Sequence, residues 1–181
     1  MNKLDKDISK VLYTKEQIGK RVSEIGYELS LNFLDRNPVL VCILRGAVVF
    51  LVDLMRYMTI PLEIDFMSVS SYGSSTVSSG VVQIRKDIDL DIAKRHVIVV
   101  EDIVDSGLSL QYILDFLKRR NPTSITTCAF LNKPAAHKVQ IKIDYIGYEI
   151  ENDFVVGYGL DYADKYRNLP YIGILKEEIY K

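Results

Sequence analysis

The sequence predicts an α/β fold in which a doubly wound, mostly parallel sheet is flanked by helices. Continuous apolar runs rich in β-branched residues, which are typical of buried parallel strands, occur at residues 39–44 and 97–100, and a further strand pattern covers residues 124–131. Helical stretches alternate with these runs, as in the strand–helix–strand units of a parallel sheet. The length of 181 residues fits a single domain spanning residues 1–181, with a core that needs no disulfide bond or structural metal.

The chain begins with a pattern for a short edge strand at residues 8–13, followed by a long amphipathic helix. Thr14 and Gln17 match a capping box, in which two side chains satisfy backbone N–H groups at a helix start. Apolar residues then recur at spacings of three and four and share one helical face: Ile18, Val22, Ile25, Leu29 and Phe33. We expect Asn37 and Pro38 to end this helix.

The apolar run at residues 39–44 stops at a glycine turn and is followed by a helix at residues 48–57. A third strand pattern covers residues 62–69, and residues 81–84 are its expected return strand. The segment between them, residues 70–80, reads SSYGSSTVSSG. Such small polar residues usually form a mobile hairpin loop and nothing more, but a loop of this length in a compact chain is often a lid over a binding site.

The second half of the chain adds one helix and several strands. The helix is expected at residues 108–117, and strands are expected at residues 124–131, 143–150 and 171–175. No internal repeat or linker divides the chain. Ligands of open α/β sheets bind at the carboxyl ends of the strands, so several turns should meet there. These turns are at Arg45, Glu101 to Ser109, Lys133 and Asp161.

Composition and charge restrict the possible partners. The formal net charge is −1 at pH 7, so a broad basic face for nucleic acid is not expected. The first residues, MNKLDKDISK, lack the apolar core of a signal peptide, and the apolar stretch at residues 47–54 is too short to span a membrane. We therefore expect a soluble cytoplasmic protein. Cys42 and Cys128 lie in apolar runs and are expected to be buried free thiols.

The stretch HVIVVEDIVDSGLSL, from His96 to Leu110, is the candidate site. An apolar strand meets an acidic turn with adjacent carboxylates, Glu101 and Asp102, which need a cation, hydrogen-bond donors or solvent if they are buried. Residues 105–109 read DSGLS and lead into a helix N-terminus, where free amides favour an anion. A phosphate-binding loop beside carboxylates that can accept hydrogen bonds from hydroxyl groups indicates a sugar-phosphate site. The alternative is that the two carboxylates only cap nearby amides.

Other phosphate-binding and nucleophile motifs are absent from the sequence. Neither GxxxxGK[ST] nor GxGxxG occurs, which excludes a nucleotide P-loop and a dinucleotide fingerprint. The two histidines, His96 and His137, lie in no recognisable nucleophile context. We expect both to be structural or surface groups.

The stretch VIVVEDIVDSGLSL resembles the phosphoribosyl-diphosphate signature of type I phosphoribosyltransferases. Further segments resemble the hypoxanthine-guanine phosphoribosyltransferases within that family: LRGA at residues 44–47, SSYG at 70–73, Lys133 after a strand, and FVVGYGLDYADKYRNLPYIG at 154–173. The likeness covers about residues 39–173 in order and spacing. It implies the type I phosphoribosyltransferase fold, with a small hood formed by the N- and C-terminal segments and a flexible lid at about residues 70–80.

The resemblance implies a site for phosphoribosyl diphosphate. Glu101 and Asp102 would hold the ribose hydroxyls, directly or through Mg²⁺, and Asp161 would bind a second Mg²⁺. The residues that would bind the 5′-phosphate are Asp105, Ser106, Gly107, Leu108 and Ser109. Those that would bind the diphosphate are Leu44, Arg45, Gly46 and Arg167, with a cis peptide bond before Arg45.

The resemblance also implies a purine site beside the sugar. Lys133 would donate to the 6-oxo group, Phe154 would stack on the base, and the Val155 backbone would contact the edge that carries N1. Ile103 and Asp161 would also contact the purine. Asp105 would be the catalytic residue and would accept the N7 proton. Ser71 and Tyr72 would lie on the lid that closes over the site.

The implied activity is Mg²⁺-dependent purine salvage, in which phosphoribosyl diphosphate and hypoxanthine or guanine give IMP or GMP and diphosphate. A homo-dimer or homo-tetramer is implied as well. One alternative is a regulatory nucleotide- or RNA-binding protein on the same fold, against which Asp105, Lys133 and the near-neutral charge argue. The other is a pyrimidine- or adenine-specific transferase, which the match of Lys133 and FVVGYGLDY disfavours.

Overall fold

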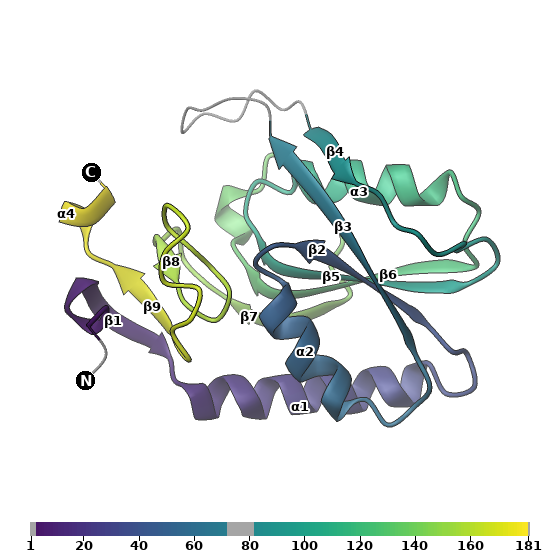
Figure 1. The fold of residues 1–181 in the computed structure, drawn as a ribbon, viewed down its shortest axis with the longest axis horizontal. Coiled ribbons are helices and arrows are strands. Elements are labelled where there is room, and N and C mark those ends of the chain that lie inside the picture. The colour runs from purple at the N-terminus through teal and green to yellow at the C-terminus, as the bar shows by residue number, and fades with distance from the viewer. Residues whose placement is uncertain (1–2, 72–81, 181) are drawn as a thin grey trace.

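The computed structural model describes residues 3–71 and 82–180, which form a six-stranded and a three-stranded sheet (Figure 1). The larger sheet has the order β4-β3-β2-β5-β6-β7 and the smaller the order β1-β9-β8. The strands are β1 (Ile8–Tyr13), β2 (Val39–Leu44), β3 (Glu63–Ser71), β4 (Val82–Lys86), β5 (His96–Val104), β6 (Ser124–Asn132), β7 (Tyr145–Glu149), β8 (Val155–Val156) and β9 (Ile172–Leu175). The α-helices are α1 (Lys15–Asn32), α2 (Val48–Tyr57), α3 (Leu108–Lys118) and α4 (Glu177–Tyr180), and two short 3₁₀ helices are η1 (Asp5–Asp7) and η2 (Pro134–Ala136).

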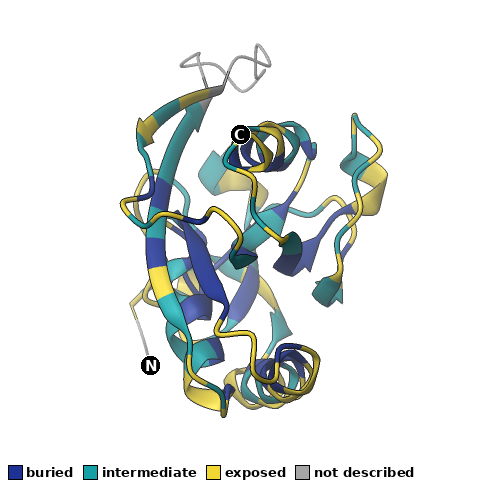
Figure 2. Ribbon diagram, turned by 90° about the vertical axis from the view of Figure 1, so that its right-hand side faces the viewer, coloured by how far each residue is buried: buried dark blue, intermediate teal, exposed yellow. Residues whose placement is uncertain are grey.

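The predicted doubly wound sheet is confirmed. Within the six-stranded sheet, β3, β2, β5, β6 and β7 run parallel, and only β4 is antiparallel to its neighbour. α1 and α2 cover one face of the sheet and α3 covers the other (Figure 1). Alternate side chains of each central strand point to opposite faces of the sheet. Leu40 packs with α1 and α2, whereas Val41 packs with α3. The central strands are therefore buried on both sides (Figure 2).

The start of α1 is confirmed, but its predicted end is wrong. Gln17 N–H donates to Thr14 Oγ1 at 3.4 Å and Thr14 N–H donates to Gln17 Oε1 at 2.8 Å, which completes the capping box. The helix ends at Asn32, before the expected stop at Asn37 and Pro38. Asp35 and Asn37 adopt positive φ angles of 59° and 42°, which no α-helix accommodates.

β5 is longer than its apolar run predicts. The strand continues to Val104, so Glu101 and Asp102 are strand residues and the expected acidic turn does not exist. The physical reason is the ladder with β6, which continues through the pairs Glu101–Ala129 and Val104–Asn132. Backbone pairing thus extends the strand through polar residues.

The small sheet joins the two ends of the chain. β1 near the N-terminus pairs antiparallel with β9 near the C-terminus, and β8 pairs with the other edge of β9. The family resemblance predicts a hood formed by these two ends of the chain, and this assignment stays a prediction. Both cysteines are buried and free, as predicted, and burial raises the pKa of Cys42 to about 12, with the nearby charges of Glu101 and Asp102 adding to the effect. No helix in the described ranges is long and apolar enough to cross a membrane.

Candidate active site

The carboxyl ends of β2, β5 and β6 lie at one edge of the large sheet, as their parallel order requires. The turn after β2 carries Arg45 and Gly46, the segment after β5 carries residues 105–107, and Lys133 directly follows β6. The loop at residues 157–167 reaches the same edge, because Arg45 pairs with Asp164 of this loop. The predicted meeting of these turns is confirmed.

A cavity of about 110 Å³ lies at the N-terminus of α3. It is lined by Glu101, Ile103, Val104, Asp105, Ser106, Gly107, Ser109 and Leu110. Gly107 is the N-cap of α3 with a φ of 77°, and a Cβ atom here would lie 3.0 Å from Val139 Cγ2, so glycine suits this position. Leu108 N–H donates to Ser106 Oγ at 3.4 Å. Free amides at a helix N-terminus favour an anion such as phosphate in this cavity.

A second cavity, of about 260 Å³, adjoins the first. It is lined by Asp102, Ile103, Asp105, Lys133, Phe154, Val155, Leu160 and Asp161. Ile103 and Asp105 line both cavities, so the exposed Asp105 stands at their junction. A ligand that filled both cavities would have to pass this carboxylate.

Lys133 reaches the second cavity from the end of β6. Its backbone N–H donates to the Val104 carbonyl oxygen at 2.9 Å, which fixes it beside the end of β5. The residue is only 8% exposed and forms no ion pair with any described residue. An ammonium group only donates hydrogen bonds, so a ligand carbonyl in this cavity is a favourable partner for Lys133.

Glu101 and Asp102 are adjacent carboxylates, and one of their oxygen atoms lacks a hydrogen-bond partner in the described ranges. Glu101 Oε2 is buried and has no hydrogen-bond partner among the described residues. Burial, followed by the charge of Asp102, raises the pKa of Glu101 well above its ordinary value. Burial raises the pKa of Asp102 to about 6, although Ile103 N–H donates to Asp102 Oδ1 at 2.8 Å. The pair therefore favours a cation or ligand hydroxyl groups.

This pair fits Mg²⁺ bound together with a substrate. Mg²⁺ commonly uses one or two protein carboxylates and completes its shell with water and phosphate oxygens. The unpartnered Glu101 Oε2 supplies such a carboxylate oxygen. In residues 3–71 and 82–180, no three His, Cys, Asp or Glu side chains are grouped so that they could hold a metal ion by themselves. Additional ligands would come from substrate and water.

The turn after β2 packs closely on β5 and on the loop at residues 157–167. The peptide bond between Leu44 and Arg45 is cis, as expected. A Cβ atom at Gly46 would lie 1.6 Å from Asp102 Oδ2, and a Cβ atom at Gly159 would lie 2.1 Å from the Gly46 carbonyl oxygen. Glycine at both positions therefore lets the turn, the strand and the loop approach one another.

Two arginines of this region are held by carboxylates of the loop at residues 157–167. Arg167 Nη2 lies 2.6 Å from Asp161 Oδ1, and Arg167 Nη1 donates to the Gly159 carbonyl oxygen at 2.7 Å. Arg45 Nη2 pairs with Asp164 Oδ1. The structure thus brings both arginines of the predicted diphosphate site to one loop.

Phe154 lines the second cavity and belongs to a cluster of three aromatic rings. Its ring stacks on Tyr180 of α4 with a centroid distance of 4.7 Å and an interplanar angle of 20°. Tyr162 packs edge-on against Phe154 at 5.6 Å. The ring predicted to bind the base is therefore held by the C-terminal helix.

The structure places most of the predicted site residues together and adds several that sequence reasoning missed. Tyr72 and most of the predicted lid lie outside the described residues, and Ser71 is the last residue of β3. Leu160 and Gly159 were missed, although both lie in the segment FVVGYGLDY that resembles the family. Asp164 lies two residues beyond this segment, within the longer stretch at residues 154–173, and no motif marks it.

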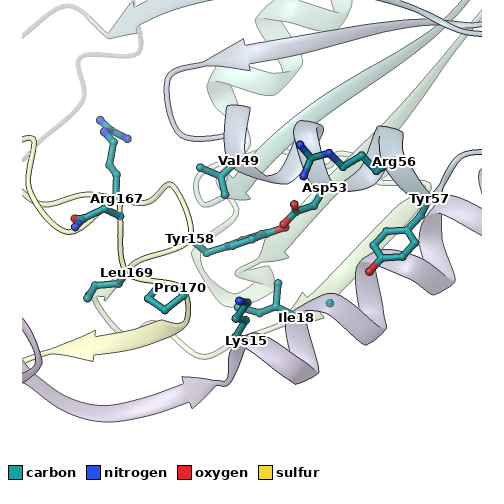
Figure 3. Close-up of a pocket in the computed structure, with 12 residues that line it drawn as sticks. Lys15, Ile18, Val49, Asp53, Arg56, Tyr57, Tyr158, Arg167, Leu169 and Pro170 are labelled. Atoms are coloured by element: carbon teal, nitrogen blue, oxygen red, sulfur yellow. The ribbon is translucent and has the colours of Figure 1, made fainter. Parts of the chain in front are cut away.

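A further cavity, of about 600 Å³, lies between α1, α2 and the loop at residues 157–170. Figure 3 shows Tyr158 pointing toward Asp53, and its hydroxyl donates to Asp53 Oδ2 at 2.8 Å. The guanidinium group of Arg167 points away from Leu169 and Pro170 (Figure 3). Arg167 thus borders this cavity, while its guanidinium group contacts Asp161 and the Gly159 carbonyl oxygen.

Comparisons with known proteins agree with this geometry. Residues 9–163 match the model of the phosphoribosyl transferase domain family. The hypoxanthine-guanine phosphoribosyltransferase of Streptococcus thermophilus (strain CNRZ 1066) is 48% identical over 177 residues, 98% of each chain. That of Bacillus subtilis (strain 168) is 49% identical over 175 residues, 97% of each chain. A crystal structure of a hypoxanthine phosphoribosyltransferase from Staphylococcus aureus is 41% identical, with a TM-score of 0.96 over 99% of this chain and 98% of that chain.

Proposed function

The chain belongs to the phosphoribosyl transferase family, and we propose that it is a purine-salvage enzyme. It transfers the 5-phosphoribosyl group from phosphoribosyl diphosphate to N9 of hypoxanthine or guanine, giving IMP or GMP and diphosphate. The names of the two curated relatives support this activity. The observation that carries it is the position of Asp105 between a phosphate-sized cavity and a cavity with Lys133 and Phe154.

The phosphoribosyl group binds at the end of β5 in this proposal. The 5′-phosphate occupies the cavity at the N-terminus of α3, where it meets free amides and the hydroxyl groups of Ser106 and Ser109. Glu101 and Asp102 bind the ribose hydroxyl groups, either by accepting their hydrogen bonds or through Mg²⁺. When bound, Mg²⁺ supplies positive charge to the phosphates and orients them. Asp161 remains the proposed contact of a second Mg²⁺.

Arg45 and Arg167 stabilise the leaving diphosphate. Breaking the bond between C1′ and diphosphate develops positive charge on the ribose and negative charge on the leaving group. Preorganised cations and backbone amides aimed at that negative charge lower the barrier. Leu44 and Gly46 supply backbone groups to this part of the site.

The purine occupies the cavity between Lys133 and Phe154. Lys133 donates to the 6-oxo group of hypoxanthine or guanine, whereas the 6-amino group of adenine would face the ammonium group donor to donor. Phe154 stacks on the base, the Val155 backbone contacts the edge carrying N1, and Ile103 lines the same cavity. As N9 forms its bond to C1′, Asp105 accepts the proton from N7.

Three further predictions accompany this proposal. Lid closure by Ser71 and Tyr72 would exclude water, which otherwise hydrolyses the activated sugar. We also expect a homo-dimer or homo-tetramer and a cytoplasmic location. The lid and the oligomeric state are expected from the resemblance to the family.

A panel of bases tests the proposed function. The protein is incubated with Mg²⁺, phosphoribosyl diphosphate and each of hypoxanthine, guanine, xanthine, adenine and uracil, and nucleotide formation is followed by chromatography. We expect IMP and GMP to form and adenine and uracil to remain unconverted. No nucleotide from either hypoxanthine or guanine would contradict the proposal. In the same panel, Lys133→Ala should weaken the discrimination against adenine.

A further inference from the structure

Asp164 occupies the space between the two cations that the proposed function assigns to the diphosphate. Its Oδ1 atom pairs with Arg45 Nη2 and lies 3.5 Å from Arg167 Nη2. One carboxylate oxygen thus lies between two guanidinium groups. An oxygen of a bound diphosphate that used both arginines would need the same place.

A tight turn presents Asp164 to these arginines. Tyr162 N–H donates to the Lys165 carbonyl oxygen at 3.2 Å, and Lys165 N–H donates to that of Tyr162 at 3.0 Å. Ala163 and Asp164 between them have φ angles of 50° and 61°, the sign that a type I′ turn requires at both central positions. Asp164 N–H also donates to Asp161 Oδ2 at 2.9 Å. The backbone of the turn therefore fixes where the carboxylate projects.

The contact with Arg45 can exchange readily for a ligand. The side chains of Arg45 and Asp164 are 67% and 65% exposed, and exposed ion pairs contribute little free energy. A diphosphate carries more charge than one carboxylate and offers more acceptor oxygens to a guanidinium group. The ligand can therefore displace Asp164, but binding must first break the existing contact.

We infer that Asp164 is an internal competitor for the diphosphate group, which weakens the binding of diphosphate to Arg45 and Arg167. The inference rests on the proposed function, because it takes both arginines as diphosphate ligands. Substrate and product share the diphosphate group, so Asp164 acts on both. It limits the affinity for phosphoribosyl diphosphate and favours the release of the product diphosphate.

Titration of inorganic diphosphate into the full chain, with excess Mg²⁺ and constant ionic strength, tests this inference by calorimetry. We expect Asp164→Asn to bind diphosphate at least about threefold more tightly than the wild type. The control is Asp115→Asn on α3, which removes the same charge from an ion pair of similar exposure with Lys118. Its affinity should equal that of the wild type. Unchanged or weaker binding by Asp164→Asn would overturn the inference.

A double-mutant cycle separates competition from a general charge effect. In an Arg45→Ala background the main contact of Asp164 is gone, so Asp164→Asn should increase diphosphate affinity less than it does in the wild type. An equal increase in both backgrounds would show that Asp164 acts only as a distant negative charge and would overturn the inference. A wild type that makes no IMP or GMP contradicts the proposed function instead, whereas an active wild type with unaltered Asp164→Asn binding contradicts this inference alone.

Discussion

Asp105 stands between two cavities, and this position allows two different roles. It can hold the sugar phosphate, or it can accept a proton from a purine bound on its other side. A binding residue contributes equally to the ground state and the transition state, whereas a proton acceptor contributes chiefly to the transition state. Kinetic constants and affinities of one variant distinguish the two roles.

We expect Asp105→Asn to lower kcat by about 10²- to 10⁴-fold, because asparagine keeps the size of the side chain but cannot take the N7 proton. The dissociation constant for phosphoribosyl diphosphate, measured by calorimetry, should change far less. Ser109→Ala is the matched variant in the same cavity and should show the reverse pattern, with binding weakened more than kcat. Equal losses of kcat and affinity in Asp105→Asn would identify it as a binding residue.

Sequence reasoning identified the candidate site residues that lie in one short contiguous motif. The run from Glu101 to Ser109 combines its acids, hydroxyl groups and glycine in nine positions, so its chemistry is visible without coordinates. Asp164 could not be found in this way, because its partner Arg45 lies 119 positions earlier. Only the folded chain shows that the two side chains meet.

Among the helices and strands, boundaries set by local sequence signals were predicted more accurately than boundaries set by pairing between distant segments. The bounds of α2 match the prediction, because a glycine turn and a helical apolar pattern mark them locally. The end of β5 was missed, since pairing with β6 carries this strand through Glu101 and Asp102. No local signal predicted the pairing of β1 with β9, which joins opposite ends of the chain; only the family resemblance implied a hood built from these two ends.

The short helix α4 holds an aromatic side chain against the proposed purine site. Its four residues place Tyr180 flat against Phe154, the ring proposed to stack on the purine. An aromatic ring stacked in this way restricts the orientation of its neighbour. We therefore expect α4 to support the purine site from behind.

Replacing Tyr180 by Ala should raise KM for hypoxanthine by about threefold to tenfold, because a stacked aromatic pair contributes about 0.5–1.5 kcal/mol beyond buried area. KM for phosphoribosyl diphosphate should stay near the wild-type value. Tyr180→Phe keeps the ring and should restore KM for hypoxanthine. A Phe variant as impaired as the Ala variant would show that the hydroxyl group, not the ring, matters.

At the scale of the whole molecule, one buried carboxylate connects the large sheet to the segment that follows β4. Asp65 of β3 is 5% exposed, and its Oδ2 atom accepts N–H groups of Asp89 at 2.7 Å and Leu90 at 2.8 Å. Burial by itself raises the pKa of Asp65, but the N–H groups of Leu90, Phe66 and Asp89 and the charge of Lys86 outweigh burial and lower it. The folded state therefore favours the ionised carboxylate.

A lowered pKa in the folded state makes the stability of the molecule depend on pH in one direction. The stabilisation by Asp65 is fully present above its pKa in the unfolded chain, about 3.9, and is lost as pH falls through the lower folded value. Asp65→Asn should reduce the free energy of unfolding at pH 7 by about 1–3 kcal/mol, because the asparagine amide cannot accept all of these N–H groups. Thermal unfolding should show a Tm lower by roughly 2–10 °C.

The difference in Tm between wild type and Asp65→Asn should shrink as the pH is lowered below about 4, because the wild-type carboxylate then also becomes neutral. Asp89→Asn is the matched control, since it removes an exposed partner of Lys86 but keeps the backbone N–H that donates to Asp65. Its Tm should stay within about 1 °C of the wild type at every pH, as expected for an exposed ion pair. A difference for Asp65→Asn that persisted undiminished at low pH would mean that packing, rather than the charge of Asp65, connects β3 to this segment.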